Sequence, residues 1–261
     1  MFPYFIVLGR PIATYGMMAA LGGIIAALVM YLLIRKIGGN FADMMLFGGF
    51  VAMGIIIGGS LMYGITNLRF VPFLFTARSF DEFFAIVLRV FGGSVFYGGL
   101  IGGSFAGYLC TRIFKLDLKL YFGSFGVVAP LFHAFARVGC FLGGCCFGIE
   151  SKFGFTVHNN SLVPAINGVN RFPVQLLEAT LNLLIFAGLL IFYLRGIGRG
   201  KMFFAYTGIY SVCRFFVEFL RGDEVRGFVG CFSTSQFISV FVFGASICAL
   251  ILIGRKEKNI E

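Results

Sequence analysis

Residues 13–34 read ATYGMMAALGGIIAALVMYLLI, a run of 22 residues that contains no charged side chain. A helix of this length is about 33 Å long, because each residue adds about 1.5 Å, and the hydrocarbon core of a bilayer is about 30 Å thick. Arg35 and Lys36 follow at once, as basic residues do where a helix leaves the membrane on its cytoplasmic side. The stretch therefore predicts a transmembrane helix.

Six further stretches share this apolar character and length. Of the 261 residues, 59% are apolar and only 12% are charged, whereas a soluble domain has about a quarter of its residues charged. The sequence therefore predicts an all-α membrane protein with about seven transmembrane helices, forming one polytopic domain over residues 1–261. The six additional predicted spans lie at 41–63, 92–113, 121–146, 175–194, 202–220 and 235–254.

The charges between the predicted spans predict the topology. The longer joins, at 64–91, 147–174 and 221–234, hold five of the 11 acidic residues, whereas the short joins between spans hold only Asp117. By the positive-inside rule the short basic joins face the cytoplasm, so the N-terminus lies outside and the C-terminus lies in the cytoplasm. The same rule explains the net charge of +10, and no nucleic-acid partner is expected. The basic joins contain Arg35, Lys36, Lys115, Lys119, Arg195, Arg199 and Lys201, and the C-terminal tail contains Arg255, Lys256 and Lys258.

Two of the outer joins have features of their own. The join at 64–91 is rich in aromatic and apolar residues, with Arg69, Arg78 and Arg89 spaced through it. This composition predicts a short amphipathic outer arm that lies in the headgroup region. The join at 147–174 is long enough only for a small outer cap.

Ionisable side chains inside the predicted spans are candidates for function, because a charge at the bilayer centre costs about 3 kcal/mol on insertion scales. In the fourth span, His133, Arg137 and Cys140 share one helix face. One face of the sixth span carries two arginines and a glutamate. Two polar stripes that each contain an arginine predict an anion held inside the bilayer. The stripe of the sixth span consists of Tyr210, Arg214, Glu218 and Arg221.

Each of these candidates also has an interpretation that needs no ligand. Arg214 and Glu218 are four residues apart and can neutralise each other as a pair. His133 can bond a neighbouring carbonyl group, and Arg221 near a helix end can reach the surface. Arg137 has no carboxylate in its own span, so the ligand-free interpretation is weakest for this residue.

The segment 139–148 reads GCFLGGCCFG and combines four glycines with three thiols. The spacing Cys-x4-Cys-Cys is not a standard zinc pattern, and no histidine pair accompanies it, so no metal is expected. The glycines instead predict that the helix breaks here and that its backbone N–H groups face an anionic headgroup.

The segment 133–148, HAFARVGCFLGGCCFG, resembles the signature segment of the bacterial prolipoprotein diacylglyceryl transferase family. Other elements of that family have counterparts here in the same order, and together they cover nearly the whole chain. An ordered set of this kind is far more specific than any one motif. The counterparts are YGMM at 15–18, FYGGLIGG at 96–103, RFPVQLLEA at 171–179, RFFVEFLR at 214–221 and SQFIS at 235–239.

The resemblance implies an enzyme of the bacterial inner membrane. Such an enzyme transfers the diacylglyceryl group of phosphatidylglycerol to the lipobox cysteine thiol in a prolipoprotein signal peptide, and it uses no cofactor or metal. Its partners are these two substrates and the membrane lipids. Carried onto this chain, the resemblance implies catalytic roles for Arg137, Arg214, Glu218 and Tyr97. The residues implied to bind phosphatidylglycerol are Arg137, Tyr15, His133, Gly139, Gly148, Gln175, Glu178 and Arg221.

Three residues depart from the family pattern. Better-known members have a histidine at the place of Tyr97, an asparagine at the place of Cys140 and a glutamate at the place of Cys145. Tyrosine, with a reference pKa of about 10, is a poorer base at neutral pH than histidine. Two alternatives therefore stay open: a non-catalytic protein that binds or transports lipid, and a relative that lipidates a different acceptor.

Overall fold

Six helices of the computed structural model are long and apolar enough to cross a membrane, counted over the residues that it describes, which are 2–7, 9–93, 95–160, 163–223 and 228–258. The predicted all-α membrane fold is confirmed. The six are α1 (Thr14–Lys36), α2 (Phe41–Thr66), α5 (Leu118–Gly143), α6 (Val174–Leu194), α8 (Thr234–Lys258) and a composite segment, in which α7 (Met202–Val217) lies between the short 3-10 helices η3 (Arg199–Lys201) and η4 (Glu218–Leu220).

The seventh predicted span, 92–113, corresponds to α4 (Phe96–Ile113), which is not one of these six helices. Gly92 instead caps the preceding helix, and α4 begins four residues later than the predicted span. Its 18 residues give a length of about 27 Å, and its five glycines lower its hydropathy. The predicted number of seven spans is therefore not confirmed.

The chain forms two compact units, one of residues 1–33 with 123–261 and the other of residues 34–122. The expectation of one polytopic domain stays a prediction.

In the unit of residues 34–122, α2 and α4 pack closely through glycines. A Cβ atom on Gly54 would lie 2.3 Å from the carbonyl oxygen of Gly102. Only glycine permits such an approach, as in other close pairs of membrane helices.

The same unit contains the predicted amphipathic arm. It consists of the 3-10 helix η1 (Leu68–Phe75) and α3 (Phe80–Phe91). The Ser79 hydroxyl accepts a hydrogen bond from the backbone N–H of Glu82 at 3.1 Å and so starts α3 as an N-cap. The arm thus takes a defined helical structure rather than that of an extended loop.

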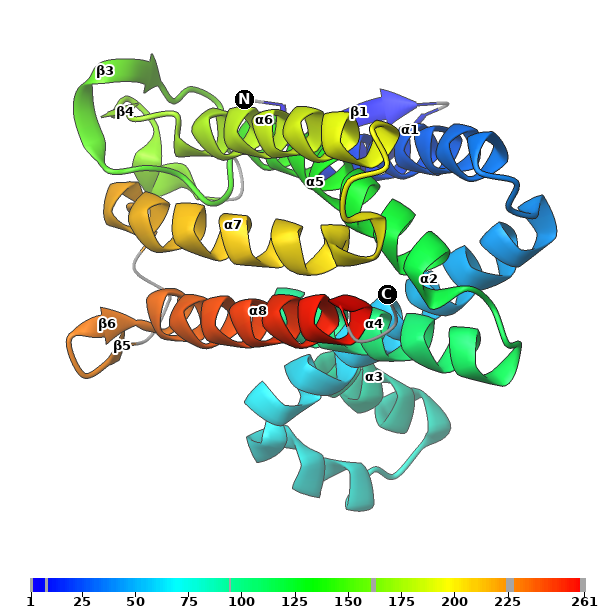
Figure 1. The fold of residues 1–261 in the computed structure, drawn as a ribbon. Coiled ribbons are helices and arrows are strands. Elements are labelled where there is room, and N and C mark those ends of the chain that lie inside the picture. The colour runs from blue at the N-terminus through cyan, green and yellow to red at the C-terminus, as the bar shows by residue number, and fades with distance from the viewer. Residues whose placement is uncertain (1, 8, 94, 161–162, 224–227, 259–261) are drawn as a thin grey trace. The chain divides into compact units, whose positions relative to one another are not determined.

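The other unit contains α6, α7 and α8 together with most of α1 and most of α5. Within it α7 lies between α6 and α8 and packs against both (Figure 1). Gly126 brings α5 against α7, since a Cβ atom there would lie 2.2 Å from the backbone nitrogen of Phe203. Gly22 of α1 lies against Phe135 of α5 in the same way. These close approaches hold α1, α5 and α7 together.

Short strands complete this unit. The predicted cap over 147–174 is an antiparallel pair and one 3-10 turn. The pair is irregular, because Glu150 and Phe155 both align with Arg171. The strands pair as β1 (Tyr4–Val7) with β2 (Arg10–Ala13), β3 (Glu150–Thr156) with β4 (Asn170–Arg171), and β5 (Phe228–Val229) with β6 (Phe232–Ser233), and the turn is η2 (Pro164–Ile166).

Candidate functional site

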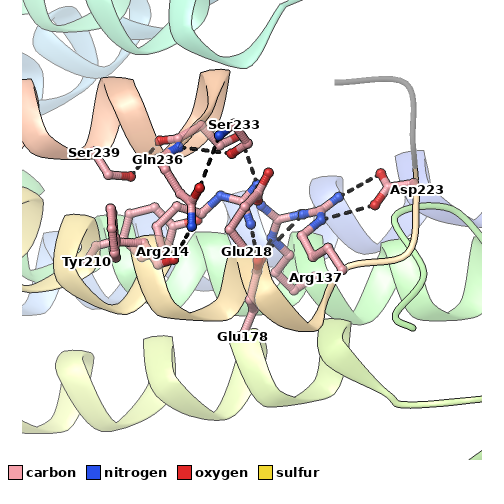
Figure 2. A network of polar contacts seen from close by, with 12 residues as sticks. Arg137, Glu178, Tyr210, Arg214, Glu218, Asp223, Ser233, Gln236 and Ser239 are labelled. Atoms are coloured by element: carbon pink, nitrogen blue, oxygen red, sulfur yellow. Dashed lines mark hydrogen bonds and ion pairs between the residues drawn. The ribbon is translucent and has the colours of Figure 1, made fainter. Parts of the chain in front are cut away.

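Three arginines converge on the buried carboxylate of Glu178. Glu178 lies on α6 with 2% of its surface exposed. Arg137 of α5 forms an ion pair through Nε with Oε2 of Glu178. Nη1 of Arg214 lies 2.8 Å from Oε1 of Glu178, and Nη1 of Arg221 lies 3.5 Å from the same oxygen. Figure 2 shows Arg137 and Arg214 meeting Glu178 from separate segments of the chain.

Two further carboxylates flank this meeting point. Nη2 of Arg214 lies 2.7 Å from Oε2 of Glu218 and donates a hydrogen bond to Ser235 Oγ at 3.2 Å. Arg221 grips Asp223 with two parallel hydrogen bonds, of 3.2 and 3.0 Å. Three positive and three negative side chains thus balance in charge within the group. We refer to the six residues Arg137, Glu178, Arg214, Glu218, Arg221 and Asp223 as the arginine cluster.

The arginine cluster changes the interpretation of Arg137. The sequence offers this residue no carboxylate on its own helix, but the fold supplies Glu178 from α6. Arg214 and Glu218 form the pair that their spacing indicated, and Arg214 also binds Glu178. A buried charge left without its partner costs about 3–5 kcal/mol. Each member of the arginine cluster therefore depends on the others for its stability.

His133 connects the arginine cluster to two tyrosines. Its Nε2 lies 3.2 Å from Nε of Arg137, which is a donor, so Nε2 accepts and Nδ1 carries the proton. Nδ1 lies 2.9 Å from the hydroxyl of Tyr206, and the hydroxyl of Tyr210 lies 3.5 Å from Nε2. The alternative of a simple bond from His133 to a neighbouring carbonyl group stays a prediction. Through its contact with Arg137, His133 fixes the Nε side of that guanidinium group.

Arg221 is held in place by its backbone. The chain around Gly148 runs antiparallel to the chain around Arg221, and the N–H of Gly222 donates to the carbonyl of Phe147 at 3.0 Å. A Cβ atom on Gly148 would lie 2.2 Å from the carbonyl oxygen of Phe172. Gly148, which was expected to bind lipid, therefore has a demonstrable packing role beside the arginine cluster, and lipid contact there stays a prediction.

Three other predicted lipid ligands lie near the C-terminal end of α5 or are expected there. Gln175 donates from Nε2 to the carbonyl of Cys145 at 2.8 Å and so fixes the loop after this helix. Gly139 lies against α1, where a Cβ atom would be 3.3 Å from Cα of Tyr15. Tyr15 itself is exposed. Lipid contact by these three residues stays a prediction.

The Tyr97 side chain lies outside the described part of the structure, so its catalytic role stays a prediction.

Three residues that contact the site were not predicted. They are Asp223, Tyr206 and Ser235. Asp223 follows the helical stripe of the sixth span and has no periodic relation to it. Only its place two residues after Arg221 could have indicated the pairing.

A group of thiols acts electrostatically on Arg221. The sulfurs of Cys140, Cys145 and Cys146 all lie within 4.8 Å of one another, and Cys146 is the thiol that raises the pKa of Arg221. Burial alone would lower the pKa of Arg221, but Cys146, Asp223 and Glu178 outweigh burial and raise this pKa. The guanidinium therefore stays charged.

Comparison with known sequences gives a consistent result. A sequence model of the prolipoprotein diacylglyceryl transferase family matches residues 3–252. The chain is 36% identical to phosphatidylglycerol–prolipoprotein diacylglyceryl transferase 2 of Clostridium perfringens, with 96% of each chain covered. It is 32% identical to the corresponding transferase of Clostridium tetani, with 97% of this chain and 94% of that one covered. The transferase of Geobacter sulfurreducens is 28% identical, with 93% and 91% covered.

Proposed function

Since this chain belongs to the prolipoprotein diacylglyceryl transferase family, we propose that its arginine cluster holds the lipid phosphate during transfer. The chain is a multi-pass membrane transferase that moves the diacylglyceryl group of phosphatidylglycerol to prolipoproteins, the first step of bacterial lipoprotein maturation. The acceptor that we propose is the lipobox cysteine thiol.

The convergence of three guanidinium groups on one buried carboxylate carries this proposal. Guanidinium groups bind phosphate with the same forked geometry that they use for a carboxylate. The contacts of Glu178 with Arg137, Arg214 and Arg221 therefore mark directions along which a phosphate oxygen can bind. A phosphodiester entering the arginine cluster takes over contacts that the carboxylates make in its absence.

The reaction explains why several arginines are useful. The acceptor sulfur forms a bond to a glycerol carbon, the bond from that carbon to the phosphate oxygen breaks, and its electron pair leaves with glycerol phosphate. The thiol proton passes to solvent or to a base. The phosphate charge grows from about −1 in the diester to about −1.5 to −2 in the released monoester. Fixed guanidinium groups stabilise that growing charge more than they stabilise the substrate, which is the requirement for catalysis.

The contacts support a proposed role for each arginine. Arg137 binds the phosphate and is oriented by His133. Arg214 faces the reacting headgroup, and Glu218 forms an ion pair with its Nη2 atom. Arg221, next to the outer loop, binds the leaving group as it departs. The proposed site lies toward the outer leaflet, with the N-terminus outside and the C-terminus in the cytoplasm. Reporter fusions after residues 158 and 198 should then report opposite sides of the membrane.

A transfer assay tests the proposal. Purified protein in liposomes with labelled phosphatidylglycerol is mixed with a lipobox peptide that carries cysteine, or serine in its place. We expect label on the cysteine peptide alone. Arg214→Ala should lower the rate about 10²-fold or more, while Arg195→Ala, at the exposed end of α6, should not. Retained lipid without any labelled peptide would instead indicate a lipid-binding protein, and labelled serine peptide would indicate a different acceptor.

A further inference from the structure

Asp223 occupies the face of Arg221 that best fits a phosphate. The two oxygens of its carboxylate accept hydrogen bonds from Nε and Nη2 of Arg221 at 3.2 and 3.0 Å. This is the forked edge by which a guanidinium group binds either a carboxylate or a phosphate. The third nitrogen of Arg221, Nη1, lies 3.5 Å from Oε1 of Glu178. A lipid phosphate that uses both donors of the forked edge must therefore displace Asp223.

The carboxylates that hold the other two arginines are much harder to displace. Glu178, which pairs with Arg137 and Arg214, has 2% of its side chain exposed, and Glu218 has 7%. Moving either carboxylate away would leave a buried arginine without its partner, which is strongly destabilising. Asp223 has 19% of its side chain exposed and lies outside the helices and strands of the described structure. It is therefore the carboxylate of the arginine cluster that can yield most readily.

The backbone holds Arg221 in place independently of Asp223. Arg221 forms a bridge with Gly148, and the N–H of Gly222 donates to the carbonyl of Phe147 at 3.0 Å. The approach is close, since a Cβ atom on Gly222 would lie 2.5 Å from the carbonyl oxygen of Gly148. Asp223 follows this anchor by one residue. Rotation of its side chain can therefore carry the carboxylate away while Arg221 keeps its position.

Water also competes for the carboxylate of Asp223. Burial raises the pKa of Asp223, and the positive charge of Arg221 offsets this effect only in part. The ion pair thus does not fully compensate the carboxylate for the hydration that it has lost. Because Asp223 is the most exposed of the three carboxylates, it regains hydration when it leaves Arg221. This gain lowers the cost of the exchange.

Exchange of Asp223 for the lipid phosphate conserves charge. A phosphodiester carries about one negative charge, as the aspartate does, so the three arginines stay balanced by Glu178, Glu218 and the phosphate. After transfer the released monoester carries about −1.5 to −2, which gives the arginine cluster a surplus of negative charge. Return of Asp223 to Arg221 then repels the product. One carboxylate thereby admits the substrate and favours release of the product.

We propose that Asp223 is an internal competitor of the lipid phosphate, whose carboxylate occupies Arg221 in the empty site, yields to phosphatidylglycerol and returns to displace glycerol phosphate. This inference rests on the proposed function for the identity of the substrate. Asp223 takes no part in making or breaking bonds. A purely structural partner of Arg221 would have the opposite effect on binding, because its removal would leave Arg221 misplaced and would weaken the hold on the lipid.

Asp223→Asn tests the competition in the full-length protein. The KM for phosphatidylglycerol is measured in mixed micelles with the lipobox peptide, and calorimetry measures the Kd of glycerol phosphate in the same detergent. We expect both constants to fall about three- to tenfold, the range set by the coupling of a partly exposed ion pair. Asp223→Ser, which also removes the charge, should act in the same direction. Glu150→Gln removes an exposed carboxylate paired with Arg171 and should change neither constant.

A second background shows whether the effect acts through Arg221. In Arg221→Gln, adding Asp223→Asn should leave the Kd of glycerol phosphate unchanged, because the group for which the two anions compete is gone. A rise in both constants, or no change, in Asp223→Asn and Asp223→Ser would overturn the inference. An equal fall in the Arg221→Gln background would also overturn it. These results in a protein that transfers lipid would leave the proposed function intact, whereas a wild type without transfer would refute that function, and calorimetry would still test the competition.

Discussion

Replacing Glu178 with glutamine removes the negative charge that three arginines share and keeps nearly the same shape. Glu178 is 2% exposed, and its Oε1 lies 2.8 Å from Arg214. At an effective dielectric constant of about 20, that contact corresponds to roughly 6 kcal/mol of Coulomb energy before desolvation is counted. Measured losses on removing one partner of a buried pair are about 3–5 kcal/mol. Because the amide oxygen still accepts hydrogen bonds, we expect the free energy of unfolding to fall by about 3 kcal/mol.

The lipid dependence of that loss separates a phosphate site from a purely structural network. Glu178→Gln leaves three arginines with two carboxylates, so the arginine cluster gains a surplus positive charge. Phosphatidylglycerol should then recover most of the lost stability, because its phosphate can replace the missing carboxylate. Phosphatidylcholine should recover less, since its choline group carries a positive charge.

The assay is equilibrium unfolding in maltoside micelles, titrated with sodium dodecyl sulfate and followed by circular dichroism with and without each lipid. Glu150→Gln is the matched control, because Glu150 is 72% exposed and lies 3.5 Å from Arg171. That change should stay within about 0.5 kcal/mol. Equal recovery by both lipids would refute the reasoning, and so would a loss in Glu178→Gln no larger than that in Glu150→Gln.

Three further predictions concern single side chains. Arg137→Lys should lower the transfer rate by about 10²-fold while phosphatidylglycerol still binds, because an ammonium group cannot reproduce a forked grip, and full activity would contradict this. Gly148→Ala should lower the free energy of unfolding by about 1–3 kcal/mol, since its Cβ atom would lie 2.2 Å from a carbonyl oxygen. The Cβ atom of Gly143→Ala would meet nothing within 4 Å, so this control should be nearly neutral in the same unfolding assay. Tyr97→Phe should slow transfer only about two- to tenfold if its hydroxyl merely hydrogen-bonds the headgroup, and a loss of about 10²-fold or more in pH–rate measurements would make Tyr97 the base.

The sequence predicts the membrane helices well because their signal is local. The predicted stretch 41–63 and the helix Phe41–Thr66 begin at the same residue, since a long apolar run can be recognised without knowledge of its neighbours in the fold. The same reasoning fails at 92–113. The glycines of α4 lower its mean hydropathy, and the same glycines let α4 approach α2 closely. Whether a glycine-rich stretch packs in this way depends on the partner helix, which a local pattern does not show.

The site shows the same division between local and distant information. Spacing along a helix placed Arg214 and Glu218 on one face, and they do form an ion pair. Spacing could not reveal that Glu178, on another helix, also serves Arg137, because such a pair depends on tertiary packing. The thiol cluster escaped prediction for a related reason. Its geometry depends on a left-handed turn at Cys146, which no residue pattern specifies.

The most direct test of the phosphate site is the distance between lipid phosphorus and arginine nitrogen. Protein labelled with ¹⁵N-arginine is prepared in maltoside micelles with one equivalent of a phosphonate analogue of phosphatidylglycerol, so that the ligand supplies the only phosphorus. Solid-state NMR of the frozen sample then measures dipolar coupling between ³¹P and the guanidinium ¹⁵N nuclei. We predict coupling at close range in the wild type, a weaker signal in Arg137→Lys, and an unchanged signal in Arg195→Lys. Coupling that is absent from the wild type, or that survives undiminished in Arg137→Lys, would contradict the assignment of the arginine cluster as the phosphate site.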